Sequence, residues 1–226
     1  MSRAADEGWE NFRAQDGALA YGLVTGFPRK ALDQLLRSIP DFPEPKPELE
    51  QYPTPPFAAL QLLEHAWQAG DLAGSVADLG CGTGRLALGA AFLGAKVVGV
   101  ELDSGALEVA RQAATGAELE VEWRCDAVEN WTQQVDTIVM NPPWGAQRPG
   151  ADRPFLRAAL ATAGSVWSLQ PAVSDRFLRR YVEQLGGAVT GAWPVDLKLE
   201  RTMPHHTRER KTVEGTLYHL HPVGAR

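Results

Sequence analysis

The sequence predicts an α/β fold in which helices cover both faces of a mostly parallel sheet, and two observations support this prediction. From residue 57 onward, short apolar segments typical of strands alternate with segments of helical periodicity, as in chains that join parallel strands by crossover helices. Near the C-terminal end, two long strand-like segments follow each other without a helix between them, which is typical of an antiparallel hairpin. We therefore expect a doubly wound sheet that closes with such a hairpin.

The chain before this alternation is expected to form three parts. Residues 1–29 lack sustained periodicity and are interpreted as a loosely ordered extension to a single domain that spans residues 30–226. Residues 31–39 carry Leu and Ile at helical spacing. Residues 40–56 contain seven prolines, which predicts a stiff, extended strap across the domain surface; a plain linker is the alternative interpretation.

The rest of the chain divides into helices and strands by the same patterns. Helical spacing predicts a short helix after residue 125 and longer helices at about 57–69, 85–94, 104–114, 153–163 and 174–185. Apolar runs predict strands at 75–79, 96–102, 118–124, 136–140 and 165–169, and two long strands near 187–199 and 212–221.

The composition is that of one globular domain. Of 226 residues, 44% are hydrophobic and 22% are charged, and the net charge is -6, so the chain is not expected to coat nucleic acid through bulk positive charge. The N-terminus is charged from the third residue, and no apolar run is long enough to span a bilayer, so neither a secretory signal nor a membrane partner is expected. Cys81 and Cys125 are too few for a disulfide framework. We expect a cytoplasmic protein without a metal site.

A glycine loop follows the strand at 75–79. In "VADLGCGTGRLALG", Gly80, Gly82 and Gly84 stand between a strand and a helix, where bare backbone lets a ligand approach closely. Nicotinamide-dependent oxidoreductases usually have G-x-G-x-x-G at this turn, whereas here glycines alternate and Asp78 stands two residues before the first. This spacing resembles the first motif of S-adenosylmethionine-dependent methyltransferases. The resemblance implies S-adenosyl-L-methionine as cofactor, with Asp78 fixing the loop and the amino acid end.

Polar residues end the next two strands as well. Glu101 ends the second strand, where a carboxylate can accept both ribose hydroxyls of a nucleoside, and Asp126 follows the third, where an acceptor can bind an adenine amino group. Ligands of open α/β sheets collect at the carboxyl ends of strands. We therefore expect Glu101 and Asp126 to face the same cofactor as the glycine loop.

The fourth strand stops at Asn-Pro-Pro-Trp because Pro142 and Pro143 have no backbone N–H to continue a ladder. The motif resembles the fourth motif of methyltransferases that modify planar amino groups. The nitrogen of such a group is a poor nucleophile. The Asn141 side-chain oxygen and the Pro142 carbonyl would accept its two N–H groups, and Trp144 would stack on the planar group. Both prolines would keep these catalytic groups in place.

Five segments together point to one family: "LEQYPTPP", "DLGCGTG", "VMNPPWG", "ADRPFL" and "PHHTRERKTVEGTLYHL". They resemble the archaeal and eukaryotic small-subunit rRNA adenine 6-amino methyltransferases, the methyltransferase-like protein five group. The resemblance implies a Rossmann-like class I methyltransferase fold with a seven-stranded sheet, 6-methyladenosine as product in RNA, and a strap over the cofactor. The cofactor-binding residues that it implies are Gln51, Tyr52, Thr54, Asp78, Gly80, Gly82, Thr83, Gly84, Arg85, Glu101, Asp126 and Ala127. Two positions depart from the family pattern, since Trp144 stands where Phe is usual and Glu101 where Asp is usual.

Basic residues gather in two stretches that would flank the cofactor end of the sheet. Arginine and lysine there can neutralise RNA phosphates, although a solvated basic turn is the alternative. The candidate RNA contacts are Arg148, Arg153, His206, Arg208, Arg210 and Lys211.

The family resemblance also implies a partner protein, a small zinc-containing activator that docks by strand addition on the strand at 119–124. Two other functions compete with RNA methylation. A protein glutamine methyltransferase acting on a release factor uses a similar motif but usually carries a helical N-terminal domain, for which the first 50 residues are too rich in proline. A non-catalytic cofactor-binding subunit is disfavoured because the Asn-Pro-Pro-Trp motif is intact.

Overall fold

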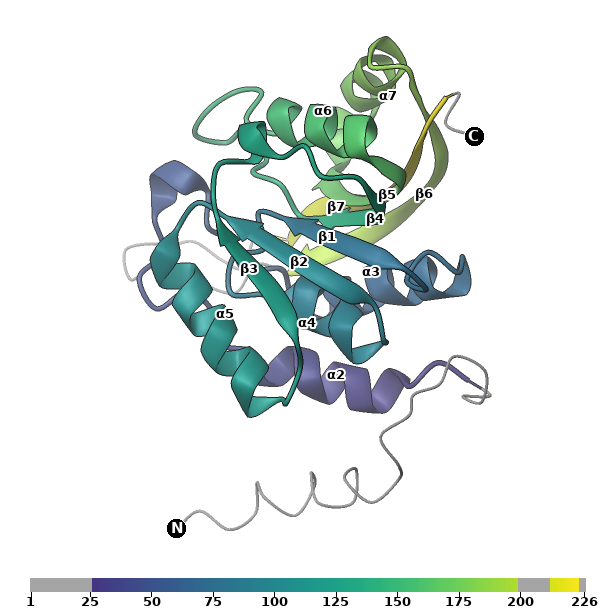
Figure 1. Cartoon of the computed structure of the whole chain (residues 1–226). Coiled ribbons are helices and arrows are strands. Elements are labelled where there is room, and N and C mark those ends of the chain that lie inside the picture. The colour runs from purple at the N-terminus through teal and green to yellow at the C-terminus, as the bar shows by residue number, and fades with distance from the viewer. Residues whose placement is uncertain (1–25, 199–211, 224–226) are drawn as a thin grey trace.

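The computed structural model describes residues 26–198 and 212–223 and contains one seven-stranded sheet between two layers of helices (Figure 1). The strand order is β3-β2-β1-β4-β5-β7-β6. The strands are β1 (Ser75–Leu79), β2 (Lys96–Glu101), β3 (Val121–Cys125), β4 (Val135–Met140), β5 (Ala163–Pro171), β6 (Gly187–Lys198) and β7 (Thr212–Pro222). Strands β1 to β5 pair in parallel, whereas β7 pairs antiparallel with both β5 and β6. The predicted fold class, including its C-terminal hairpin, is confirmed.

The helices divide between the two faces of the sheet (Figure 1). The face drawn below carries α2 (Arg29–Ser38), α3 (Pro56–Gln68), α4 (Arg85–Phe92) and α5 (Ser104–Gly116). The face drawn above carries α6 (Arg153–Thr162) and α7 (Asp175–Gln184). Three short 3-10 turns complete the described elements, η1 (Pro47–Leu49), η2 (Val128–Asn130) and η3 (Ala172–Ser174). No helix in these described ranges is both long and apolar enough to cross a bilayer.

Each face has its own hydrophobic core. On the α2 side, Leu32, Leu35 and Leu36 are buried at helical spacing against α3 and α4, and each buried leucine contributes about 1.5–3 kcal/mol to folding. On the opposite side, Leu156 of α6 and Leu178 of α7 pack onto the sheet. The two cores hold the sheet rigid between them, so that residues at its strand ends are positioned by packed elements.

Two strands and the strap differ from their predicted form for reasons that the structure shows. Strand β3 begins at Val121, not at 118, because Glu118 adopts a left-handed φ of 54° and the Leu119 amide bonds the Ala114 carbonyl to close α5. Strand β5 is longer than predicted because its pairing with β7 continues to Pro171. The strap at 40–56 is not extended throughout, since it contains η1. Most of the predicted extension, residues 1–25, lies outside the described residues.

Candidate active site

The glycine loop after β1 is enclosed by the strap on one side and by α6 on the other. Gly80, Gly82 and Gly84 all have positive φ, at 72°, 54° and 90°, a region that side chains other than glycine disfavour. A Cβ atom on Gly82 would lie 2.6 Å from Phe42 of the strap, and one on Gly80 would lie 2.9 Å from Phe155 of α6. The alternating glycines therefore allow both the turn and the close approach of two neighbouring elements.

Asp78 lies beneath this loop with only one of its carboxylate oxygens hydrogen-bonded. Its Oδ2 accepts a hydrogen bond of 2.8 Å from the Ala87 amide in the first turn of α4, whereas its buried Oδ1 has no partner among the described residues. Burial raises the pKa of Asp78 to about 8. Asp78 lines the same cavity as Thr54, Thr83 and Asn141. A buried oxygen without a partner is a group that a donor on a bound ligand can satisfy, so the site suits the amino acid end of S-adenosylmethionine.

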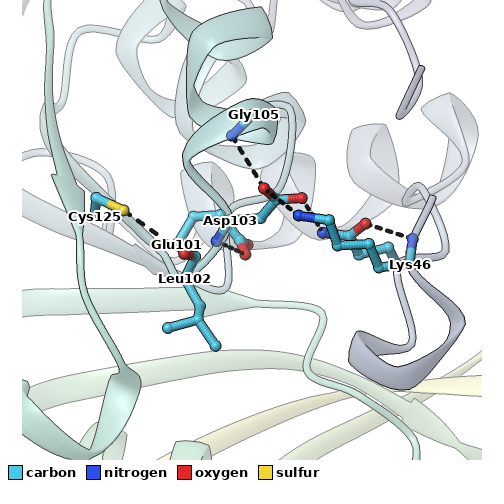
Figure 2. Close-up of polar contacts among 7 residues, drawn as sticks. Lys46, Glu101, Leu102, Asp103, Gly105 and Cys125 are labelled. Carbon is cyan, nitrogen blue, oxygen red and sulfur yellow. Dashed lines mark hydrogen bonds and ion pairs between the residues drawn. The ribbon is translucent and has the colours of Figure 1, made fainter. Parts of the chain in front are cut away.

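Glu101 is held at the end of β2 by two backbone amides, and Figure 2 shows the one that belongs to Asp103. Its Oε2 accepts from Gly82 at 3.0 Å and its Oε1 accepts from Asp103 at 2.9 Å. Burial raises the pKa of Glu101, against the hydrogen bonds that lower it. Each carboxylate oxygen keeps a further lone pair. This orientation would allow Glu101 to accept ribose hydroxyls, and that role stays a prediction.

The strap is fastened to Asp103 just beyond β2 (Figure 2). Lys46 Nζ lies 2.8 Å from Asp103 Oδ1, and Gln51 Nε2 donates to Asp103 Oδ2 at 2.8 Å. Gln51 Oε1 in turn accepts from the Lys46 amide at 2.8 Å. Although burial raises the pKa of Asp103, the hydrogen bonds from Gln51 and Lys46 hold that pKa below its usual value. Gln51 was predicted as a cofactor contact, and that role stays a prediction. Lys46 and Asp103 were missed, because these residues meet only through the path of the strap.

Arg85 also holds the strap. Its guanidinium is buried and donates to the carbonyls of Leu36, Ile39 and Thr54 at 3.0, 2.6 and 2.7 Å. It also pairs with Asp41 at 3.0 Å. Arg85 thus caps the C-terminal end of α2 and ties it to the strap. Its predicted contact with the cofactor stays a prediction, with one N–H left for it.

Asn141 is fixed from two sides at the end of β4. The indole Nε1 of Trp144 donates to Asn141 Oδ1 at 3.2 Å, and Asn141 Nδ2 donates to Thr54 Oγ1 at 3.0 Å. An indole N–H can only donate, so the amide atom that faces it must be the oxygen. This geometry sets the orientation of the amide and leaves one lone pair of Oδ1 for another donor. A phenylalanine in place of Trp144 would not provide that N–H.

Glu50, which sequence reasoning missed, joins the strap to the loop that follows Asn-Pro-Pro-Trp. Its Oε1 accepts from the amides of Gln147 and Arg148 at 2.8 and 3.3 Å. The residue is buried, has a left-handed φ of 51°, and leaves its Oε2 without a partner among the described residues. A strained backbone of this kind is characteristic of functional loops. The sequence gives little indication of this role, because a glutamate in a proline-rich segment is usually expected to be exposed to solvent.

The other predicted residues divide into three groups. Asp126 follows β3 and accepts from Ala127 and Asn130, and its amide bonds the Glu101 carbonyl at 3.1 Å, so both strand-end acids are neighbours. Tyr52 is 41% exposed beside the cavity that it lines. Of the RNA candidates, Arg148 and Arg153 lie in the loop after Trp144 and at the start of α6. The remaining candidates, His206, Arg208, Arg210 and Lys211, lie outside the described residues.

Known proteins share this chain's sequence and fold. Residues 57–169 match the methyltransferase small domain. The chain is 32% identical over 196 residues to the rRNA N(6)-adenosine-methyltransferase Mettl5 of Drosophila melanogaster, covering 82% of this chain and 92% of that protein. It is 39% identical over 151 residues to METTL5 of Danio rerio, covering 62% and 72%.

A solved structure agrees with these relatives. The crystal structure of PH1948 from Pyrococcus horikoshii has a TM-score of 0.81 and 34% identity, and the match covers 88% of this chain and 99% of that one. With the glycine loop and the paired strand-end acids in place, these matches show that the chain belongs to the methyltransferase small domain family, in the group of the METTL5 proteins, and is an S-adenosylmethionine-dependent methyltransferase.

Proposed function

We propose that this enzyme methylates the 6-amino group of an adenosine in RNA, with small-subunit ribosomal RNA as its substrate. The observation that carries the proposal is the side chain of Asn141, whose amide is oriented by Trp144 and Thr54 at the end of β4. Its free lone pair suits an N–H of a planar amine. The proposal is supported by the two relatives from fly and zebrafish, both named as rRNA N(6)-adenosine-methyltransferases.

The residues of the motif act on the amine by position and hydrogen bonding. Asn141 Oδ1 and the Pro142 carbonyl each accept one N–H of the target amine, which directs the nitrogen lone pair away from the ring. Trp144 stacks on the base and limits its movement. S-adenosylmethionine supplies, when bound, a methyl group on a positively charged sulfur. With that cofactor bound, the N–C bond would form as the S–C bond breaks, and the amine held by Asn141 and Pro142 would release one proton to solvent.

The RNA target must leave its stack to reach this site. An adenine amino group inside a duplex is not accessible to Asn141, so the substrate is an unpaired or easily unpaired adenosine in a loop or junction. Arg148 and Arg153, which follow the motif in the loop after Trp144 and at the start of α6, would contact phosphates near that base. We assign this activity to the cytoplasm, which agrees with the free thiols of Cys81 and Cys125.

We also propose that a small zinc-containing activator protein docks on β3. Strand β3 is an edge of the sheet, so its outer backbone groups are available for strand addition. Beside it lies a groove of about 690 Å³ between β3 and the C-terminal half of α5. The groove is lined by apolar side chains such as Leu119 and Trp123 together with charged ones such as Lys96 and Glu122. Purified chain that is soluble and fully active alone would contradict the need for this partner.

The activity is tested with labelled S-adenosylmethionine and small-subunit ribosomal RNA from cells that lack the gene. The wild-type protein and Asn141→Ala are compared, and the labelled nucleosides are identified by mass spectrometry. Label in 6-methyladenosine is expected with the wild type and is expected to fall at least 100-fold in the variant, while cofactor affinity stays within a few-fold. In a parallel reaction with a release factor in place of RNA, label in a glutamine, with none in the RNA reaction, would contradict the proposal and favour the protein glutamine methyltransferase.

A further inference from the structure

Helix α7 has an exposed face that the proposed mechanism does not use. Its buried residues, Leu178 and Val182, face the sheet. Helical spacing places Arg176, Phe177 and Arg180 on the other side of the helix, where all three are exposed. Phe177 keeps 41% of its surface exposed although it is wholly apolar, so core packing does not explain it.

Contacts with α6 organise this face into a layered surface. The Arg153 guanidinium lies over the rings of Phe177 and Tyr181, at 5.0 and 5.9 Å from their centroids. The two rings are themselves stacked, with centroids 5.6 Å apart and an interplanar angle of 14°. Arg157 Nη2 donates to the Tyr181 hydroxyl at 3.5 Å. We call the six residues Arg153, Arg157, Arg176, Phe177, Arg180 and Tyr181 the arginine–aromatic patch.

The arginine–aromatic patch lies beside the active site. Helix α6 begins directly after the loop that follows Trp144. The Phe155 side chain in its first turn packs against the glycine loop. The ring is so close that a Cβ atom added to Gly80 would lie 2.9 Å from it. The same turn carries Arg153. Helices α6 and α7 are neighbours on one face of the sheet (Figure 1), so the patch continues from the cofactor loop outward along that face.

The charge of the patch is positive in a protein whose net charge is -6. On α7, Arg179 pairs with Asp175 at 2.9 Å and is neutralised by it. Arg176 and Arg180 form no ion pair with any other residue that the structure describes. Two unpaired guanidinium groups next to stacked aromatic rings complement the phosphates and bases of a single strand of nucleic acid.

We propose that the arginine–aromatic patch binds the RNA strand that flanks the target adenosine. An unpaired base stacks against the exposed ring of Phe177, and Arg176 and Arg180 contact the adjoining phosphates. The inference rests on the proposed function, since it takes the substrate to be RNA. It extends the RNA surface beyond Arg148 and Arg153 to a helix that the sequence motifs did not indicate.

The charge contribution is tested by RNA binding at several salt concentrations. The probe is a fluorescent RNA hairpin with an unpaired adenosine-containing loop, and binding is followed by anisotropy. Arg176→Ala/Arg180→Ala is expected to weaken binding about 10-fold at low salt and to reduce the salt slope by about two. The matched control, Lys30→Ala/Arg37→Ala, removes the same charge from the exposed side of α2 and is expected to bind within twofold of the wild type.

The stacking contribution is tested separately. Phe177→Leu keeps an apolar side chain but removes the ring, and it is expected to weaken binding of the looped hairpin about 5-fold or more. Binding to a blunt duplex is expected to change much less, because a paired base cannot stack on a side chain. Val173→Ala, an exposed apolar change on the same side of the molecule, serves as control. Thermal unfolding establishes that each variant is folded.

The outcomes separate this inference from the proposed function. Patch variants that bind and methylate RNA as the wild type does would overturn the inference and leave RNA methylation standing. A wild-type enzyme that neither binds nor methylates RNA would overturn both. Losses confined to the patch variants, with the two controls unchanged, would support the inference.

Discussion

Two aspartates at opposite ends of β1 have opposite surroundings. Asp71, which precedes the strand, accepts hydrogen bonds at Oδ2 from Ser165 and Trp167 at 2.7 and 2.8 Å, with His219 Nε2 at 3.2 Å. Burial raises its pKa, but the hydrogen bonds from these three residues outweigh burial and lower it. Asp78, near the other end, has a single donor and a pKa raised to about 8.

The difference separates a stabilising end of the sheet from a functional end. At the Asp71 end, polar groups satisfy one another within the protein. At the Asp78 end, a buried oxygen has no donor among the described residues, which costs stability, and we propose that a bound ligand supplies that donor. The Ser165, His219 and Asp71 cluster is also no catalytic triad, because His219 contacts both partners through the same Nε2 atom, and a proton relay needs both ring nitrogens.

The largest effect is expected at the stabilising end. Asp71→Ala leaves the donors of Ser165, Trp167 and His219 without their acceptor, which should lower the free energy of unfolding by about 3 kcal/mol. Urea denaturation measures this change, and cofactor affinity should stay within a few-fold. Asp33→Ala, on the surface of α2, is the control and should have a much smaller effect. A stable Asp71→Ala protein would mean that the comparison between the two ends is wrong.

Asp78→Asn should have the converse effect, with cofactor affinity reduced at least 10-fold and folding retained. In the wild type, the native state holds a proton on Asp78 up to about pH 8, whereas the unfolded chain releases it near the ordinary value of 3.8. Stability from this group is therefore complete below about pH 4 and is lost as pH rises through 8. Thermal unfolding between pH 6 and 9 should show this loss in the wild type and a flatter profile in Asp78→Asn. If the stability of both proteins changed equally with pH, the raised pKa of Asp78 would not be the cause of the loss.

Near the same edge of the sheet, Trp144→Phe separates two proposed roles of Trp144, which are stacking on the target base and hydrogen bonding to Asn141. The variant keeps an aromatic ring but loses the Nε1 donor that orients the Asn141 amide. We expect kcat to fall about 10-fold, equal to about 1.4 kcal/mol, with KM for RNA within threefold. Trp67→Phe, a ring change on α3 away from the site, controls for packing. An unchanged kcat would show that Thr54 alone sets the orientation of the amide.

The smallest effect is expected at the strap. Lys46→Met removes the half-exposed partner of Asp103 while the Gln51 hydrogen bond remains. Cofactor affinity should fall about 3-fold at low salt, since an exposed ion pair contributes little. The difference should disappear at high salt because mobile ions screen the pair. Isothermal titration of both proteins at two salt concentrations measures it, with Lys30→Met as the control. A loss that persists at high salt would point to a role other than charge.

The sequence predicted the strand ends well because each carries a local signal. These signals can be recognised without knowing which segments of the chain meet in the fold. They are the glycines at alternate positions, the acid at the end of β2 and the prolines after β4. The contacts of Lys46 with Asp103 and of Glu50 with Gln147 were not predictable, since they join residues far apart through a left-handed turn in the strap. The exposed face of α7 was also missed, because arginines on an amphipathic helix usually indicate nothing more than a solvated face.

The strap has a consequence for the rate at which the enzyme can turn over. It closes over the cavity and is fastened through Gln51 to Asp103, through Glu50 to the loop after Trp144, and through Thr54 to Asn141. If the cofactor binds beneath the strap, its release would require some of these bonds to break, so we expect its dissociation to be slower than methyl transfer. Pre-steady-state kinetics would then show a burst of the first methylated product, and Lys46→Met would raise the steady-state rate. A time course without a burst would place the slow step at chemistry instead.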